Sequence, residues 1–262
     1  VSILLPASAL AEYNIGAQEV PIIRVIPFAV GSVLISRYVS LNLASQREEL
    51  LRLWYKGVEN VTLLVVPLAV LSILVAPDLV EWIATTDNAD YRNAVVPFML
   101  YNAIVLIRVT HYGSLLQAFG DSRGVLWMSL NLMVANLVLS IPFTLWLGIT
   151  GTALATLLAN LYNWVVYLHR IGRHMDLPAW KVLPFPSYLR VLGASAISAA
   201  AVGWIRHVPL DAIAPAAGLA VSAVLFLAAF ALIGTLTGAI REEDWATVRQ
   251  AVTLRLFSSK GR

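Results

Sequence analysis

Long apolar runs separated by short charged stretches dominate the amino-acid sequence. One run, residues 93–120, carries a single fully charged side chain, Arg108, and a longer one, residues 124–168, has no charged or histidine side chain. A helix needs roughly 20 apolar residues to cross the core of a bilayer. The first run is therefore long enough for one membrane span and the second for two. The pattern predicts an all-α, polytopic membrane helix bundle.

The same length criterion predicts seven full spans and one half-span over the whole chain. The spans are residues 15–36, 60–77, 93–120, 124–147, 149–168, 188–205 and 212–240. We expect the reversal between the fourth and fifth spans at Gly148-Ile-Thr-Gly151, because glycines favour a turn. Residues 1–11 are too short to cross, so we interpret them as the second half of a helix in a fragment of a longer chain. A re-entrant or purely interfacial segment is the alternative for them.

Three segments outside the spans have recognisable patterns. Ser45-Gln-Arg-Glu48 is typical of a capping box, and apolar residues follow it at helical spacing, which predicts a short amphipathic helix on the membrane surface. Residues 78–90 are predicted to be an acidic connection. The tail, residues 241–262, has apolar residues from Trp245 to Leu256 at helical spacing and is predicted to be another interfacial helix.

Composition supports the membrane interpretation and removes several functions. Hydrophobic residues make up 59% of the chain, charged residues 13%, and the mean hydropathy is +0.78, well outside the range of soluble domains. The chain has no cysteine, its 4 histidines lack the spacing of a zinc site, and it has no phosphate-binding glycine loop. We therefore expect no metal, cofactor or enzymatic centre, and no nucleic-acid partner despite the net charge of +3.

The basic residues are distributed unevenly between alternate loops. Of the 18 Lys and Arg residues, Arg92 and Arg206 fall on one side of the predicted bundle, Arg24 and Arg108 lie inside spans, and the others fall on the opposite side. The side rich in Lys and Arg is usually cytoplasmic. The pattern therefore predicts a cytoplasmic C-terminus and places the acidic connection of residues 78–90 outside.

Two arginines and one histidine within the spans are the candidate functional residues. Arg24 lies near the middle of its span, between Pro21 and Pro27, and His111 follows Arg108 by one helical turn on the same face. A charged side chain in a spanning helix costs at least ~2.5 kcal/mol and usually faces a water-filled cavity or a partner. We expect these three residues to form a cationic site for an anionic substrate. The alternative is an arginine that snorkels to the lipid head groups or bonds a neighbouring carbonyl.

Four short motifs, in a fixed order, resemble a known family. They are Tyr13-Asn-Ile-Gly16, Leu115-Leu-Gln-Ala-Phe-Gly-Asp-Ser-Arg123, Asn136-Leu-Val-Leu-Ser-Ile141 and Gly148-Ile-Thr-Gly-Thr-Ala-Leu-Ala-Thr156. Together they look like the C-terminal half of the polysaccharide flippases in the multidrug, oligosaccharidyl-lipid and polysaccharide exporter superfamily, over about residues 1–170. Neither Arg24 nor Arg108 matches a family motif residue for residue. Their assignment rests on the argument from membrane burial.

The resemblance implies one lobe of an inverted-V transporter that passes undecaprenyl-diphosphate-linked sugars across the bacterial inner membrane for cell-surface polysaccharides. Residues 1–172 would form the C-terminal lobe, residues 173–240 two additional helices, and residues 241–262 an amphipathic cytoplasmic tail. The expected partners are the lipid-linked sugar diphosphate, membrane lipid and an N-terminal lobe missing from this sequence. Two other functions fit the same fold: a drug or cation antiporter, and a non-transporting structural member of an envelope assembly.

Overall fold

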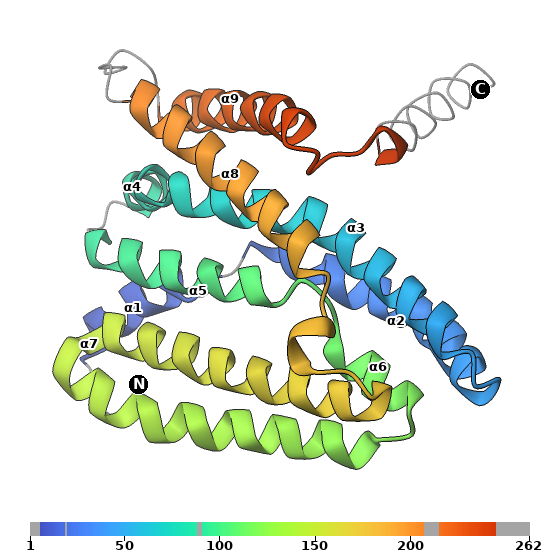
Figure 1. Cartoon of the computed structure of the whole chain (residues 1–262). Coiled ribbons are helices and arrows are strands. Elements are labelled where there is room, and N and C mark those ends of the chain that lie inside the picture. The colour runs from blue at the N-terminus through green and yellow to red at the C-terminus, as the bar shows by residue number, and fades with distance from the viewer. Residues whose placement is uncertain (1–5, 19, 88–90, 207–214, 245–262) are drawn as a thin grey trace, which may run out of the picture.

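The computed structural model describes residues 6–18, 20–87, 91–206 and 215–244, in which the chain forms helices and no strands (Figure 1). The helices are α1 (Ala7–Gly16), α2 (Pro21–Leu43), α3 (Arg47–Leu74), α4 (Ala76–Asp87), α5 (Val95–Ile107), α6 (Tyr112–Ala118), α7 (Ser122–Met175), α8 (Phe185–Arg206) and α9 (Pro215–Leu236), with 3-10 turns η1 (Arg92–Ala94) and η2 (Ala179–Lys181). The all-α prediction is confirmed.

Six helical stretches in the described residues are long and apolar enough to cross a membrane. They are Ile23–Leu43, Arg47–Leu74, Arg92–Ala118, Ser122–Met175, Phe185–Ile205 and Ala217–Leu236. The chain therefore has the helices of a multi-pass membrane protein. The count differs from the seven predicted spans because Ser122–Met175 is one continuous stretch that contains two of them.

α7 is a hairpin of two antiparallel limbs, which lie side by side in Figure 1. Gly148 breaks the helix with φ 60° and ψ −136°, a conformation that glycine adopts readily and other residues rarely do. Close to the turn, the hydroxyls of Thr144 and Thr152 are hydrogen-bonded to each other across the limbs at 2.7 Å. Further along, Asn136 Nδ2 donates to Thr156 Oγ1 at 3.2 Å. The reversal predicted at residues 148–151 is confirmed.

Asp121 closes the other end of the α7 hairpin. Its carboxylate accepts a hydrogen bond from the backbone N–H of Gly124 at 2.9 Å and so caps the first limb. It also accepts bonds from the second limb, from Arg170 Nε at 2.5 Å and Nη2 at 2.9 Å, and lies 3.0 Å from the imidazole of His174. The pKa of Asp121 lies well below its ordinary value, mainly because of the hydrogen bonds from the Arg170 guanidinium. His174 and the Gly124 N–H lower it further.

α3 forms the centre of the bundle, because α2, α5 and α8 all pack against it. Its Trp54 is fully buried, and the indole N–H donates to the carbonyl of Val182 at 2.8 Å. A Cβ on Gly57 would come within 3.0 Å of the Leu34 side chain, so α2 approaches α3 closely at this glycine. Small residues allow such close packing between membrane helices. On the other side of α3, α8 packs in turn against α9.

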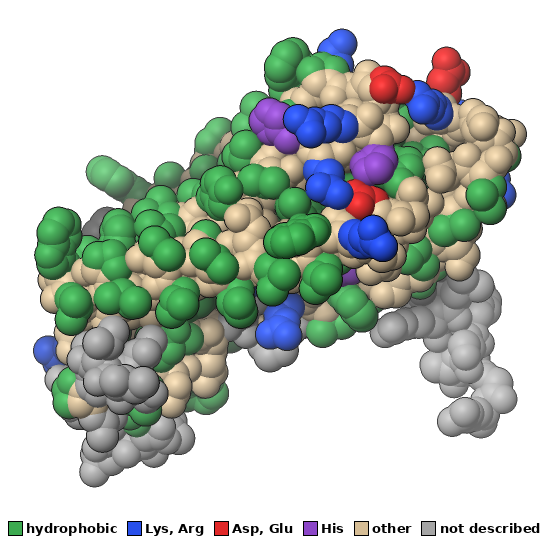
Figure 2. Space-filling view, turned by 90° about the horizontal axis from the view of Figure 1, so that it is seen from below, with side chains coloured by type: hydrophobic (Ala, Val, Ile, Leu, Met, Phe, Trp, Pro, Cys, Tyr) green, Lys and Arg blue, Asp and Glu red, His purple; other side chains and the backbone are tan. Residues whose placement is uncertain are grey.

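The outer face of α7 is apolar. Its exposed side chains include Trp127, Leu137 and Trp146, the last with 86% of its surface exposed. Figure 2 shows the side of the molecule on which α7 lies, where hydrophobic side chains are spread along the face and most charged ones gather at one end. This distribution suits a surface that contacts lipid or another membrane-embedded partner.

The N-terminal boundaries differ from the prediction. α1 runs to Gly16, beyond the expected end at Ala11, and α2 begins at Pro21 and continues to Leu43, whereas one span over residues 15–36 was expected. The capping box was wrong. Ser45 has a left-handed backbone (φ 56°) and its side chain makes no cap bond, so the predicted amphipathic segment is the first part of the long helix α3.

Two further predictions concern the polar segments. The acidic stretch after residue 78 is helical up to Asp87, in α4, and is not an extended connection there. Residues 88–90 and most of the predicted tail, residues 245–262, lie outside the described residues. The helices α8 and α9 agree with the spans predicted for residues 188–205 and 212–240, apart from their ends.

Candidate functional site

The predicted span of residues 93–120 is interrupted in its middle. α5 ends at Ile107 and α6 begins at Tyr112, with Arg108 and His111 in non-helical conformations at the two ends of the break. The prediction of one continuous helix with Arg108 and His111 on a single face was therefore wrong. Both side chains instead project from a short irregular segment, which is tolerated at membrane depth only where it is enclosed by protein or lines a cavity.

Side chains from other elements satisfy the backbone at this break. The hydroxyl of Tyr112 donates to the carbonyl of Ile107 at 2.9 Å, and the hydroxyl of Tyr188 in α8 donates to the carbonyl of Leu106 at 3.0 Å. Trp164 Nε1 in α7 donates in turn to the Tyr112 hydroxyl at 2.8 Å. The last carbonyls of α5 thus have partners although the helix stops. Specific hydrogen bonds from other parts of the fold therefore stabilise the interruption between α5 and α6.

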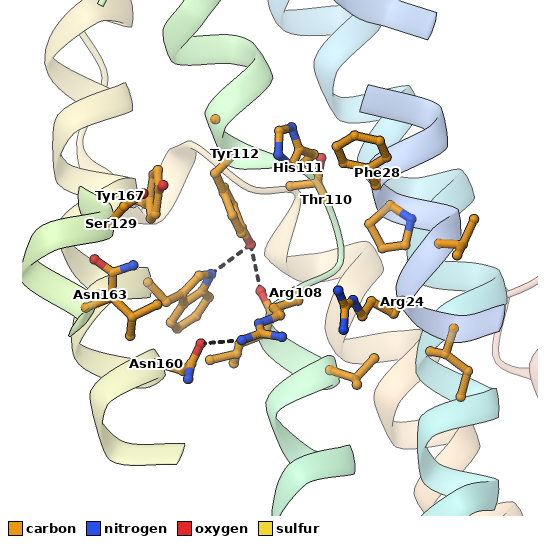
Figure 3. Close-up of a pocket in the computed structure, with 18 residues that line it drawn as sticks. Arg24, Phe28, Arg108, Thr110, His111, Tyr112, Ser129, Asn160, Asn163 and Tyr167 are labelled. Carbon is orange, nitrogen blue, oxygen red and sulfur yellow. Dashed lines mark hydrogen bonds between the residues drawn. The ribbon is translucent and has the colours of Figure 1, made fainter. Parts of the chain in front are cut away.

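A cavity of about 530 Å³ opens at the break, between α2, the α5–α6 segment and both limbs of α7. Arg24, Arg108 and His111 all line it, so the structure brings the three candidate residues together. Figure 3 shows the side chains of Arg24 and Arg108 directed toward the same space, from α2 and from the break. The lining also includes Asn160 and Tyr167 of α7.

Arg108 is oriented by α7. Its Nη2 donates to Asn160 Oδ1 at 2.8 Å, and Asn160 Nδ2 donates to the backbone carbonyl of Thr156 at 2.8 Å. The bond to Asn160 fixes the position of the Arg108 guanidinium at the wall of the cavity. No carboxylate is found among the described residues that line the cavity. The lining therefore has a positive charge.

Arg24, on α2, and His111, which contacts α2, line the part of the cavity next to that helix. Arg24 is exposed on α2, and the ring of His111 packs edge-on against Phe28 of the same helix, with ring centroids 5.3 Å apart. Gly31 makes this contact possible, since a Cβ there would lie 2.7 Å from the His111 Cβ. A larger residue at position 31 would push α2 away from the break.

The sequence analysis missed the α7 wall of the cavity. Asn160, Asn163, Trp164 and Tyr167 line it, and Asn163 Oδ1 is buried without a hydrogen-bond partner in the described structure. A signal for these residues was present. Their positions follow the i, i+3, i+4, i+7 pattern of one helix face, inside a run that has no charge.

No family model, no curated protein and no solved structure matches the sequence. Within the described part of the chain, no group of three His, Cys, Asp or Glu side chains lies close enough to hold a metal ion. The chemistry available in the cavity is thus that of two guanidinium groups, an imidazole, amides and aromatic rings. Such groups bind and orient an anion.

Proposed function

We propose that the chain belongs to a flippase, which moves an undecaprenyl-diphosphate-linked oligosaccharide or a related lipid-linked sugar across the bacterial inner membrane for cell-surface polysaccharide synthesis. The observation that carries the proposal is the meeting of Arg24 and Arg108 in one cavity between apolar helices. The motif resemblance described above gives the substrate class and adds a second lobe, before residue 1, that would complete the transporter.

The physical argument begins from the cost of moving a diphosphate through hydrocarbon. A phosphate group that leaves water without partners is strongly destabilised, and charge-assisted hydrogen bonds must replace its hydration. Guanidinium groups suit this role because they are planar, always charged and bidentate. Arg108, held by Asn160, would bind one phosphate, and Arg24 the other or the bridging region. Aromatic side chains such as Trp164 and Tyr167 would contact the sugar.

The broken helix supports a transporter in particular. Interrupted membrane helices are frequent at substrate sites, because non-helical backbone can line a cavity there. Arg108 and His111 lie at such an interruption. Rocking of this lobe against the proposed second lobe would expose the cavity to each side of the membrane in turn. The distribution of Lys and Arg favours a cytoplasmic C-terminus in this arrangement.

The two alternatives make different demands on the same cavity. A drug or cation antiporter would favour acidic or aromatic residues over arginines in its cavity; the described lining has aromatic side chains, two arginines and no acidic residue. A non-transporting member of an envelope assembly needs the helices to pack but does not need the charges of Arg24 and Arg108. Substitution of these arginines therefore separates the flippase from the structural role.

The test is transport of a fluorescent undecaprenyl-diphosphate-linked oligosaccharide by the full-length protein in proteoliposomes. Arg24→Ala and Arg108→Ala are expected to reduce the rate by tenfold or more, since each removes a charge-assisted contact of about 1.5–3 kcal/mol. Lysine at either position is expected to restore only part of the rate, because it lacks the planar fork. Arg123→Ala, at the exposed start of α7, is the control. Normal transport by both cavity variants would refute the proposal.

A further inference from the structure

A second cavity lies at the C-terminal end of α7, between its last turns and the segment that leads into η2. Its volume is about 520 Å³, and none of its lining residues lines the first cavity. A Cβ on Gly172 would lie 2.5 Å from the carbonyl oxygen of Leu177, so this glycine allows the segment to fold back closely against the helix. The polar and aromatic part of the lining consists of His169, Arg173, Asp176 and Trp180.

This cavity lies at the level of the lipid head groups. Trp127 and Trp146 are both exposed on the first limb of α7, and at the rise of an α-helix they lie about 28 Å apart. That distance is close to the thickness of the bilayer core, and tryptophans are enriched at its two surfaces. Asp121, beyond Trp127, is hydrogen-bonded to Arg170 and His174. The last turns of the second limb, with the cavity, therefore lie just outside the hydrocarbon.

An exposed apolar stripe continues from the cavity toward the membrane interior. Leu158, Tyr162 and Val165 are exposed. They lie on the same face of α7 as the exposed residues His169 and Arg173, at the spacing of successive helical turns. The face thus changes from apolar to polar and basic at the membrane surface. An acyl chain that lies along the apolar part would bring its head group to the cavity.

The surplus charge at this cavity is positive. Asp176, the one carboxylate among the described lining residues, pairs with Arg47 of α3, and the neighbouring Asp121 pairs with Arg170. Arg173 is exposed and forms no hydrogen bond or ion pair within the described part of the chain. An anion in the cavity would therefore meet a guanidinium whose charge no described carboxylate compensates.

His169 and Trp180 add two further kinds of contact. The Nδ1 atom of His169 lies 3.1 Å from the carbonyl oxygen of Val165. Because a carbonyl can only accept, Nδ1 carries the proton, and Nε2 of the neutral ring is an acceptor for a hydroxyl group. Trp180 is 70% exposed at the rim of the cavity. Such a ring is typical of the boundary between head groups and acyl chains.

We infer that this cavity binds the head group of an anionic phospholipid, of the phosphatidylglycerol type. Arg173 donates to the phosphate, His169 accepts a hydrogen bond from a glycerol hydroxyl, and Trp180 contacts the ester region. One acyl chain lies along the exposed apolar stripe from Val165 to Leu158. The site is distinct from the cavity proposed for the lipid-linked sugar, and basic cavities at the head-group level of membrane helices are suited to such lipids.

The charges of the lining select among head groups. Ethanolamine and choline head groups bring a cationic ammonium together with their phosphate. The described lining has no carboxylate to receive this ammonium except Asp176, which is already paired with Arg47. The ammonium would instead lie near the guanidinium of Arg173, where like charges repel. A glycerol head group carries no positive charge and supplies hydroxyls for His169.

The test measures lipid binding to the purified full-length protein by native mass spectrometry. Phosphatidylglycerol, phosphatidylethanolamine and phosphatidylcholine with identical acyl chains are compared, together with free glycerophosphoglycerol. We expect phosphatidylglycerol to bind about tenfold more tightly than the two zwitterionic lipids, the effect of one charge-assisted contact. Equal binding of phosphatidylethanolamine would overturn the head-group assignment. Equal binding of free glycerophosphoglycerol would overturn the assignment to a lipid.

Two variants locate the site. Arg173→Gln changes an exposed side chain without a partner in the described chain, so the protein should fold normally and bind phosphatidylglycerol about tenfold more weakly. The matched control is Arg190→Gln, because Arg190 is an exposed arginine of α8 that lines none of the cavities described here. It should bind as the wild type does. Wild-type affinity in Arg173→Gln would refute the site. An equal loss in both variants would also refute it, since it would show a general attraction to surface charge.

Discussion

Substitution of Gly148 by alanine tests the hairpin that folds α7 back on itself. At φ 60° and ψ −136° the backbone is in a region that residues with a side chain rarely adopt, and the strain of placing one there is about 1–3 kcal/mol. No heavy atom lies within 4 Å of the Cβ that alanine would add. The whole effect is therefore backbone strain, without a contribution from a clash.

Substitutions at two other glycines are expected to change the stability more and less than Gly148→Ala does. A Cβ on Gly151 would lie 1.8 Å from the carbonyl oxygen of Phe143, a backbone atom that can move only if the limbs of the hairpin separate. Gly151→Ala should therefore destabilise the protein more than Gly148→Ala. Gly193 lies within helix α8 and has open space around its Cβ position, so Gly193→Ala should leave stability unchanged or raise it by up to about 1 kcal/mol.

Thermal unfolding of the three variants and the wild type in one detergent, followed by tryptophan fluorescence, gives the comparison. Each kcal/mol lost should lower Tm by about 2–4 °C for a chain of this size. The expected order of decreasing Tm is Gly193→Ala, at or above wild type, then Gly148→Ala, then Gly151→Ala. The reasoning about the hairpin fails if Gly148→Ala and Gly193→Ala unfold at the same temperature.

Two further predictions concern the ends of the spans. Asp121→Asn should lower stability at neutral pH by about 1–2 kcal/mol, because it weakens a helix cap and a partly exposed ion pair. The pKa of Asp121 in the folded protein lies below its ordinary value of 3.8. The stabilisation that its carboxylate provides is therefore complete above pH 3.8 and is lost as the pH falls through the lower, folded-state pKa. A measurement of Tm against decreasing pH should show this loss in the wild type and not in the variant. Cysteines introduced singly at Arg47 and Glu81, in a chain without native cysteine, should be labelled by an impermeant reagent from opposite faces, and labelling from one face would contradict a spanning α3.

The sequence contained enough information for the spans and the hairpin. The lengths of the apolar runs predicted α8 and α9, and the glycines at 148 and 151 marked the reversal of α7. These features depend on local composition, so one chain read alone is sufficient. The capping box failed for the opposite reason: Ser45 adopts a left-handed conformation between two long helices, and the packing of these helices outweighs a local cap preference.

The break after Ile107 could not be predicted from its own residues. No proline or glycine lies between Arg108 and Tyr112. The Leu106 carbonyl accepts its hydrogen bond from Tyr188, and the Ile107 carbonyl accepts one from Tyr112, whose hydroxyl in turn accepts a bond from Trp164. Tyr188 and Trp164 are far away in the sequence. A stop in a helix that depends on tertiary partners leaves no local pattern.

The candidate site could be predicted in part. Arg24 and Arg108 were identified because a charge inside an apolar run is costly, and the structure brings them into one cavity with His111. The arrangement that brings these side chains together could not be predicted from the sequence, because it follows from the break between α5 and α6 and from the close approach of α2 at Gly31. The polar face of α7 from Asn160 to Tyr167 could be recognised from its helical spacing. That spacing alone does not indicate a binding site, because the charged side chain that faces it, Arg108, is brought there only by the fold.

The central claim is that Arg24 and Arg108 together hold a diphosphate, and equilibrium binding of a lipid-linked sugar diphosphate to the purified full-length protein tests it most directly. Wild type, Arg24→Ala, Arg108→Ala and the Arg123→Ala control are compared by microscale thermophoresis. We predict that each cavity variant binds tenfold or more weakly, the cost of one charge-assisted contact, and that the control binds as the wild type does. Equal affinity in all four proteins would contradict the account.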